Sequence, residues 1–309
     1  MSAGSYDEFG LLHENAAEAG LPFDPTRPPR VSRSAVRAPS GHTISALAWG
    51  EGAAELVLLH GGGQNAHTWD TVALALDRPL VAIDLPGHGH SDWRPDKRYR
   101  PQEMAEDVAF AIEHLAPEAT TLAGMSLGGL TALAALAERG ELAERLALVD
   151  ITPGVNAQKA EPILSFLDGP EVFASFDEIL ERTMAFNPTR SRSSLRRGVL
   201  HNAREREDGT WVWRYDLPTG ERLDDLEHRF ADLWDAVSAL SCPLLLVQGG
   251  LSSVVDDDDV AELQRRKPGT DVIVVEDAGH SVQGDRPLEL ARILAAFHEG
   301  HHEGHTPAT

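Results

Sequence analysis

The sequence predicts a mixed α/β fold in which a mostly parallel, doubly wound sheet carries an inserted helical cap. Short, continuously apolar runs such as residues 56–59 and 272–275 suit strands that are covered by helices on both faces. These runs alternate with longer helical patterns, which indicates crossover connections between parallel strands. The alternation breaks between about residues 152 and 240, a stretch too long for an ordinary connection, and this break predicts the insertion.

The strands and helices are expected in regular succession along the chain. Runs bounded by turn residues predict strands at 43–49, 55–60, 79–85, 120–125, 145–150, 243–248 and 271–276. Helical patterns lie between them, at 65–76, 101–115, 127–139, 257–266 and 286–299.

The order of these elements predicts how the chain is divided. Residues 1–28, punctuated by prolines, are expected to be a flexible N-terminal segment, and residues 300–309 a disordered polar tail. Residues 29–151 and 241–299 are expected to form the α/β core. Residues 152–240, which combine helical pieces with an aromatic hairpin, are expected to form a cap or lid.

Composition and charge exclude several classes of protein. A chain of 309 residues suits one large domain or a core with one sizeable insertion. Its 27 Lys and Arg against 49 Asp and Glu give a net charge of −22, which argues against nucleic acid because phosphates need a basic surface. The single cysteine, Cys242, rules out an intramolecular disulfide framework and a cysteine-based zinc cluster.

No targeting signal and no membrane partner are expected. The first 20 residues lack a basic stretch followed by an apolar one, and no run approaches the ~18 apolar residues that span a bilayer. We therefore expect a cytoplasmic protein, either a monomer or a homodimer. Loose histidines without partners to orient their rings are usually solvated, so no functional metal is expected at the C-terminal ones, His298, His301, His302 and His305.

A G-x-S-x-G motif at residues 124–128 marks a candidate nucleophile. The motif follows the apolar run 120–125 and precedes the helical pattern 127–139, so its glycines would permit a sharp turn between a strand and a helix. Such a turn presents Ser126 at the carboxyl edge of the sheet, above the start of a helix. Met125, beside it, is expected to pack beneath the turn and border the substrate pocket.

A glycine-rich loop reaches the same edge of the sheet. His60, Gly61, Gly62 and Gly63 directly follow a buried strand, and the backbone amides there, with that of Leu127, can stabilise an oxyanion on a substrate carbonyl. Gly61 and Gly63 would then border the substrate. A phosphate-binding loop is disfavoured, because the spacing of nucleotide-binding motifs is not met.

A histidine after the last strand completes a catalytic set. His280 follows Gly279 in the loop after the strand 271–276, and from there it can reach Ser126 as a general base. A loop histidine alone is usually structural or solvated. Together with the serine turn and the glycine loop, His280 becomes the leading candidate for the base.

At these motifs the chain resembles the α/β-hydrolase superfamily. The matching landmarks are residues 60–63, 84–91 (DLPGHGHS), 124–128 and 279–280, which occur in the order of the family and cover roughly residues 43 to 297. The resemblance implies a serine hydrolase with a cap and no cofactor or metal. A serine at the turn is similar to the esterase, lactonase and C–C hydrolase branches, and unlike the dehalogenases and epoxide hydrolases, whose nucleophile is aspartate.

The acid of the expected triad departs from the usual pattern of the family. In most members it follows the seventh strand, but here that loop, residues 249–255, has serines where the carboxylate would stand. Two replacements remain open. Asp150 ends the strand 145–150 at the same edge of the sheet, and Asp256 is available if its loop bends back. A structural role for Asp150, as an acceptor in the turn that follows it, also stays open.

The expected cap carries two hints about the substrate. Trp211 and Trp213 would share one face of a strand and either line an apolar pocket or pack against the main domain. A group of arginines between residues 190 and 206 either meets an anionic substrate or, more in keeping with such runs, forms a solvated helix face.

The sequence therefore predicts a serine hydrolase that cleaves a small ester or lactone through an acyl-enzyme, with Ser126, His280 and Asp150 as its triad. Two alternatives remain: a C–C bond hydrolase of vinylogous diketones, and a non-catalytic ligand receptor that kept the fold.

Overall fold

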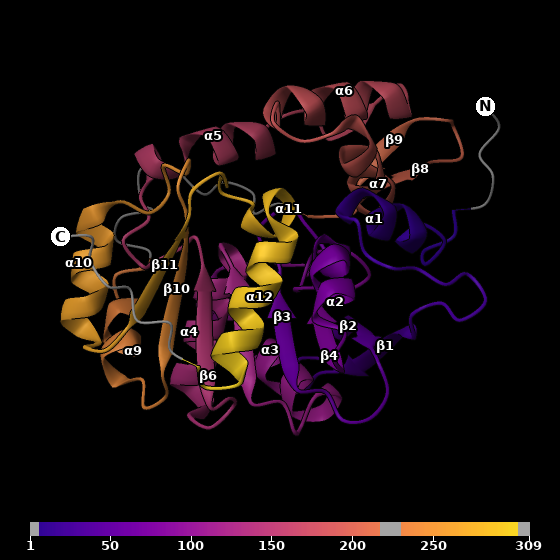
Figure 1. Cartoon of the computed structure of the whole chain (residues 1–309). Coiled ribbons are helices and arrows are strands. Elements are labelled where there is room, and N and C mark those ends of the chain that lie inside the picture. Colours follow the sequence, from indigo (N-terminus) through magenta and orange to yellow (C-terminus); the bar gives the residue numbers. More distant parts are fainter. Residues whose placement is uncertain (1–5, 217–229, 302–309) are drawn as a thin grey trace.

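The computed structural model describes residues 6–216 and 230–301, and its centre is an eight-stranded sheet with the order β1-β2-β4-β3-β5-β6-β10-β11 (Figure 1). The sheet is parallel from β4 to β11 and antiparallel where β1 and β2 add to its edge. The strands are β1 (Val31–Arg37), β2 (Thr43–Trp49), β3 (Leu56–Leu59), β4 (Leu80–Ile83), β5 (Thr121–Met125), β6 (Arg145–Val149), β10 (Leu244–Gly249) and β11 (Asp271–Val275).

Helices cover both faces of this sheet, and each face has its own apolar core. One face packs against α3 (Pro101–Leu115), α4 (Leu127–Arg139), α9 (Leu233–Ala239) and α10 (Asp257–Arg266). The other packs against α1 (Leu12–Ala19), the short helix η1 (Ala66–Trp69), α2 (Asp70–Leu76), α11 (Val282–Asp285) and α12 (Pro287–His298). Every residue of β3 and β4 is buried, as their continuous apolar sequences predict. The predicted doubly wound α/β fold is confirmed.

A long segment between β6 and β10 leaves the sheet. The expected cap, residues 152–240, does not extend to residue 240, because α9 packs on a face of the sheet. We call the part before it, residues 152–216, the insert. In Figure 1 its helices and strands lie at the top, beyond one end of the sheet. It has an apolar core of its own, centred on residues such as Phe173, Ile179 and Trp213. Its elements are α5 (Ala157–Leu167), β7 (Val172–Phe173), α6 (Phe176–Phe186), α7 (Arg192–Asn202), β8 (Ala203–Glu205) and β9 (Trp211–Trp213), with the strands in the order β7-β9-β8.

The N-terminal segment differs from the expectation of a flexible stretch over residues 1–28. Residues 12–19 form α1, in which Leu12 and Ala16 are buried against the core, and Glu18 bonds to Arg197 of the insert. β1 was likewise not predicted, because its polar, half-exposed sequence lacks the apolar signal of the inner strands. Most of the predicted tail, residues 302–309, lies outside the described residues. Within the described part of the chain, no helix is long and apolar enough to cross a membrane.

Candidate active site

Ser126 alone makes the turn between β5 and α4. Its backbone has φ 51° and ψ −120°, a conformation that costs a residue with a side chain about 1–3 kcal/mol. The glycines allow this turn because the backbone passes very close to them. A Cβ added at Gly124 would lie 2.5 Å from the backbone of Gly128, and one at Gly128 would lie 2.5 Å from the carbonyl oxygen of His60. The motif therefore acts as a strained elbow that holds Ser126 at the carboxyl edge of the sheet.

The glycine loop leaves one of its amides without a protein acceptor. The amide of Gly61 donates to Gln64 Oε1 at 3.2 Å, and that of Gly63 donates to His88 Nε2 at 3.1 Å. Burial lowers the pKa of His88 to about 3, so its ring stays neutral and can accept this bond. In the described part of the chain, the amide of Gly62 has no such partner.

The free amide of the loop lies beside the start of a helix. A Cβ added at Gly62 would contact the Leu127 side chain at 3.8 Å, and one at Gly61 would lie 3.3 Å from Cβ of Ser126. Leu127 is the first residue of α4, and the first amides of a helix have no acceptor within it. The amides of Gly62 and Leu127 are therefore both available to a negatively charged oxygen near Ser126.

His280 is held by a buried carboxylate at its Nδ1. Asp150, which follows β6, is fully buried, and its Oδ2 lies 2.7 Å from that nitrogen. The same carboxylate accepts hydrogen bonds from the Gly249 amide at 2.8 Å and from the Ser252 hydroxyl. Among the described residues, the buried Nε2 of His280 has no hydrogen-bond partner. The ring is thus fixed at one nitrogen and open at the other.

The alternative acid, Asp256, is engaged elsewhere. Its side chain accepts a hydrogen bond from the amide of Asp259 at the start of α10, and it forms an ion pair with Lys159 at 2.9 Å. Ser252 is one of the serines that the sequence places where the acid of the family usually stands. It occupies the loop in which the family usually carries its acid, and instead of replacing the carboxylate it donates a hydrogen bond to Asp150.

A cavity of about 1170 Å³ joins these groups to the insert. Ser126 and His280 both line it, as do the residues 61–63 and Met125. The insert adds apolar side chains, from Ile163, Phe166, Leu167, Phe186, Leu195 and Trp213, and also polar and charged ones such as Lys159, Asn187 and Arg190. A cavity lined by apolar side chains and a few convergent polar groups is the usual form of a small-molecule site.

The two predicted tryptophans have different positions. Trp213 lines the cavity, whereas Trp211 is not among its lining residues and packs edge to face on Phe176, with ring centroids 5.1 Å apart. The interpretation of the arginines as a solvated helix face does not hold for all of them. Arg197 is buried and bonds to Glu18, and Arg190 also lines the cavity.

The described residues also include a buried group of side chains that can act as metal ligands: His67, Asp70 and His201. The sequence did not predict this group. The spacing of His67 and Asp70 is a weak signal, and His201 comes from the insert, so only the folded chain brings the three together.

A doubly wound sheet with a serine on a strand-to-helix elbow is the architecture of α/β hydrolases. The model of the alpha/beta hydrolase family matches residues 56–293, and the chain belongs to this family. It is 46% identical to Esterase Rv0045c of Mycobacterium tuberculosis over 295 residues, which cover 93% of this chain and 94% of that protein. A solved structure of that esterase, described with its inhibition by transition metals, has a TM-score of 0.84 at 45% identity and covers 96% of this chain and 100% of that chain.

A more distant relative also acts on an ester. The chain is 30% identical to the pimeloyl-acyl-carrier-protein methyl ester esterase of Aeromonas salmonicida over 261 residues, which cover 82% of this chain and 99% of that protein. Together these relatives support a hydrolase that acts on esters.

Proposed function

We propose that this protein cleaves a small ester or lactone with an apolar acyl portion, through an acyl-enzyme formed on Ser126. One observation carries the proposal. His280 is bonded through Nδ1 to the buried Asp150, while its Nε2 has no partner in the described part of the chain, and its side chain shares a cavity with Ser126. An imidazole oriented in this way is suited to take a proton from a nearby hydroxyl.

In the proposed mechanism, Ser126 attacks the carbonyl carbon while its hydroxyl proton passes to Nε2 of His280. Asp150 can only accept hydrogen bonds when it is ionised, so it fixes the proton on Nδ1 and stabilises the imidazolium. The amides of Gly62 and Leu127 donate to the developing oxyanion. His280 then gives the proton to the leaving alcohol, and a water molecule repeats the sequence to release the acid.

The insert would act as the cap of this site. Its apolar side chains line the cavity that also contains Ser126 and His280, which favours an apolar acyl portion. The bond type is supported by the two relatives named as esterases. An ester and a lactone present the same carbonyl to Ser126, so a panel of short esters and lactones with increasing acyl length would define the preferred substrate.

The direct test compares two serine substitutions. We expect Ser126→Ala to lower the turnover of short p-nitrophenyl esters at least ~1,000-fold, because the nucleophile is lost. Ser238→Ala is the matched control, since among the described residues the hydroxyl of this exposed residue of α9 bonds only to the Trp234 carbonyl. Undiminished turnover in Ser126→Ala would exclude the proposed mechanism.

A further inference from the structure

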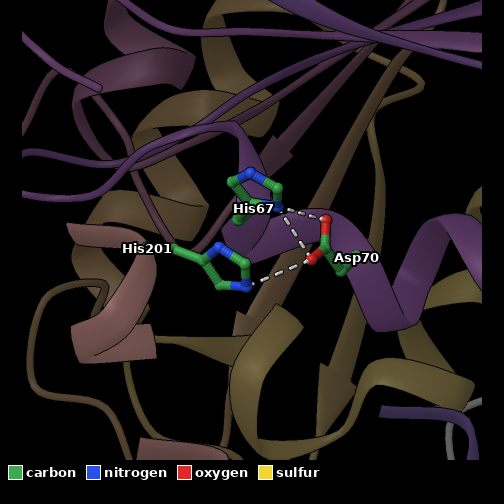
Figure 2. Close-up of side chains that lie close together, drawn as sticks. All are labelled: His67, Asp70 and His201. Carbon is green, nitrogen blue, oxygen red and sulfur yellow. Dashed lines mark hydrogen bonds and ion pairs between the residues drawn. The ribbon is translucent and has the colours of Figure 1, made fainter. Parts of the chain in front are cut away.

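Three buried side chains from two distant parts of the chain point toward one another (Figure 2). His67 lies in η1 and Asp70 begins α2, so both belong to the core, whereas His201 lies near the end of α7 in the insert. All three are buried, and each offers one ligand atom within 4.8 Å of the other two. Two imidazoles and a carboxylate are a donor set that suits zinc and its neighbours.

One nitrogen of this cluster lacks a partner. Nε2 of His201 is buried without a hydrogen bond to any described residue, and it lies 3.8 Å from Oδ2 of Asp70. With the ring proton on Nδ1, facing the Tyr6 oxygen, Nε2 has a lone pair to offer. A buried polar atom without a partner is costly, and a ligand that binds it removes that cost.

In both histidines, the ring nitrogen that faces away from Asp70 bonds to another side chain. Nε2 of His67 lies 3.1 Å from Oε1 of Glu8, and Nδ1 of His201 lies 2.5 Å from the Tyr6 hydroxyl. In metal sites the coordinating histidines usually bond through their other nitrogen to a carboxylate or a similar group, which fixes the ring and the tautomer. Glu8 and Tyr6 occupy this position here, and they leave Nδ1 of His67 and Nε2 of His201 to face Asp70.

The distances in the cluster are close to those of a coordinated ion. Nδ1 of His67 lies 2.9 Å from Oδ2 of Asp70, and His201 lies 3.8 Å from the same oxygen. Metal–ligand bonds of about 2.0–2.2 Å place the ligands of a tetrahedral zinc about 3.3 Å apart, between these two values. The two rings stack with centroids 3.8 Å apart, so one must tilt to meet a shared ion. We expect His201 to tilt, because carboxylates fix both nitrogens of His67.

We propose that His67, Asp70 and His201 bind one divalent transition-metal cation of the zinc class. His67 and His201 line the same cavity as Ser126 and His280, but neither of those two residues is a ligand. Water would complete the coordination. The donor set disfavours magnesium and calcium, which prefer oxygen ligands. Carboxylates of Asp70 and Glu8 lie within hydrogen-bond distance of the two nitrogens of His67, so the cluster offers negative charge to a cation.

A cation here would tie the insert to the core next to the catalytic loop. The next residue, Asn202, donates a hydrogen bond from its side-chain amide to the Gly63 carbonyl at 2.5 Å. The side-chain amide of Asn65 donates to the His201 carbonyl at 3.2 Å. The ligands therefore adjoin the loop that carries the Gly62 amide. The cation would fix the position of α7 relative to η1 without contacting the nucleophile.

The test measures zinc bound per chain after treatment with a chelator. The tail histidines are first removed as a competing site by substituting His301, His302 and His305 with alanine. In this background we expect one zinc per chain by equilibrium dialysis and elemental analysis, and we expect His201→Ala to weaken zinc binding about 100-fold or more. Cobalt bound at the site should show visible absorption that His201→Ala abolishes. Magnesium and calcium should not compete.

Three further variants make the result decisive. His114→Ala removes an exposed histidine and should leave zinc binding unchanged, and so should Ser126→Ala, because Ser126 is not one of the ligands. If His201→Ala does not fold, as judged by circular dichroism, His201→Gln replaces it, since its amide can still bond to Tyr6. No bound zinc in the background protein, or equal affinity after the loss of His201, would overturn the proposal.

Discussion

Two histidines of this molecule share one feature in very different surroundings. His280 and His201 are each bonded through Nδ1 to another side chain, and each buries an Nε2 that has no partner among the described residues. His280 lies in a loop at the carboxyl edge of the sheet, and its Nδ1 faces a fully buried carboxylate. His201 lies between the insert and the core, and its Nδ1 faces a phenol. We propose that each open nitrogen has its own ligand, set by its neighbours: a proton from Ser126 at His280 and a metal cation at His201.

The largest expected effect comes from a substitution that disrupts the bond between Asp150 and His280. Asp150→Asn should lower kcat for ester hydrolysis about 10³–10⁴-fold, because an amide that donates to Nδ1 of His280 forces the proton onto Nε2. KM should change little. The measurement is steady-state turnover of a short p-nitrophenyl ester.

Asp256→Asn is the matched control for this substitution, since it makes the same chemical change at the other candidate acid. Asparagine also caps helices well, so both activity and thermal stability should stay near those of the unmodified protein. A larger loss of kcat in Asp256→Asn than in Asp150→Asn would reverse the assignment of the acid.

A smaller effect is expected from the hydroxyl that bonds to the acid. Ser252→Ala should lower kcat about 10-fold, because a hydrogen bond to a charged group is worth about 1.5–3 kcal/mol and its loss leaves Asp150 less well fixed. Ser252→Thr keeps the hydroxyl and should restore most of the activity. Equal kcat values for the alanine variant and the unmodified protein would mean that Ser252 does not help to position Asp150.

The smallest effect is expected at the bond between Tyr6 and His201. Tyr6→Phe removes the hydrogen bond to Nδ1 of His201 and should lower the free energy of unfolding by about 1 kcal/mol, as measured by urea denaturation. His13→Phe, which changes another N-terminal residue, controls for a general effect of this segment. A Tyr6→Phe variant as stable as the unmodified protein would show that the phenol does not hold His201.

The sequence predicted the parts of the molecule that depend on local pattern. The inner strands, the elbow at Ser126 and the helix that follows it are encoded by neighbouring residues, and α4 has the predicted bounds. The choice between Asp150 and Asp256 needed the geometry, because both lie in loops after strands and only packing decides which one meets His280.

Two further features could not be predicted either, because they also depend on contacts between distant parts of the chain. β1 is a half-exposed edge strand with an irregular apolar pattern, so its hydrogen bonds to β2, not its side chains, define it. The cluster of His67, Asp70 and His201 joins residues more than 130 positions apart in the chain and depends on how the insert packs on the core.

Covalent labelling with a fluorophosphonate probe tests the central claim most directly, because such probes react only with an activated serine. We expect one adduct per chain, located on Ser126 by mass spectrometry of peptides, and much slower labelling in Asp150→Asn. An unmodified Ser126 under conditions that label another serine hydrolase, or an adduct on a different serine, would contradict it.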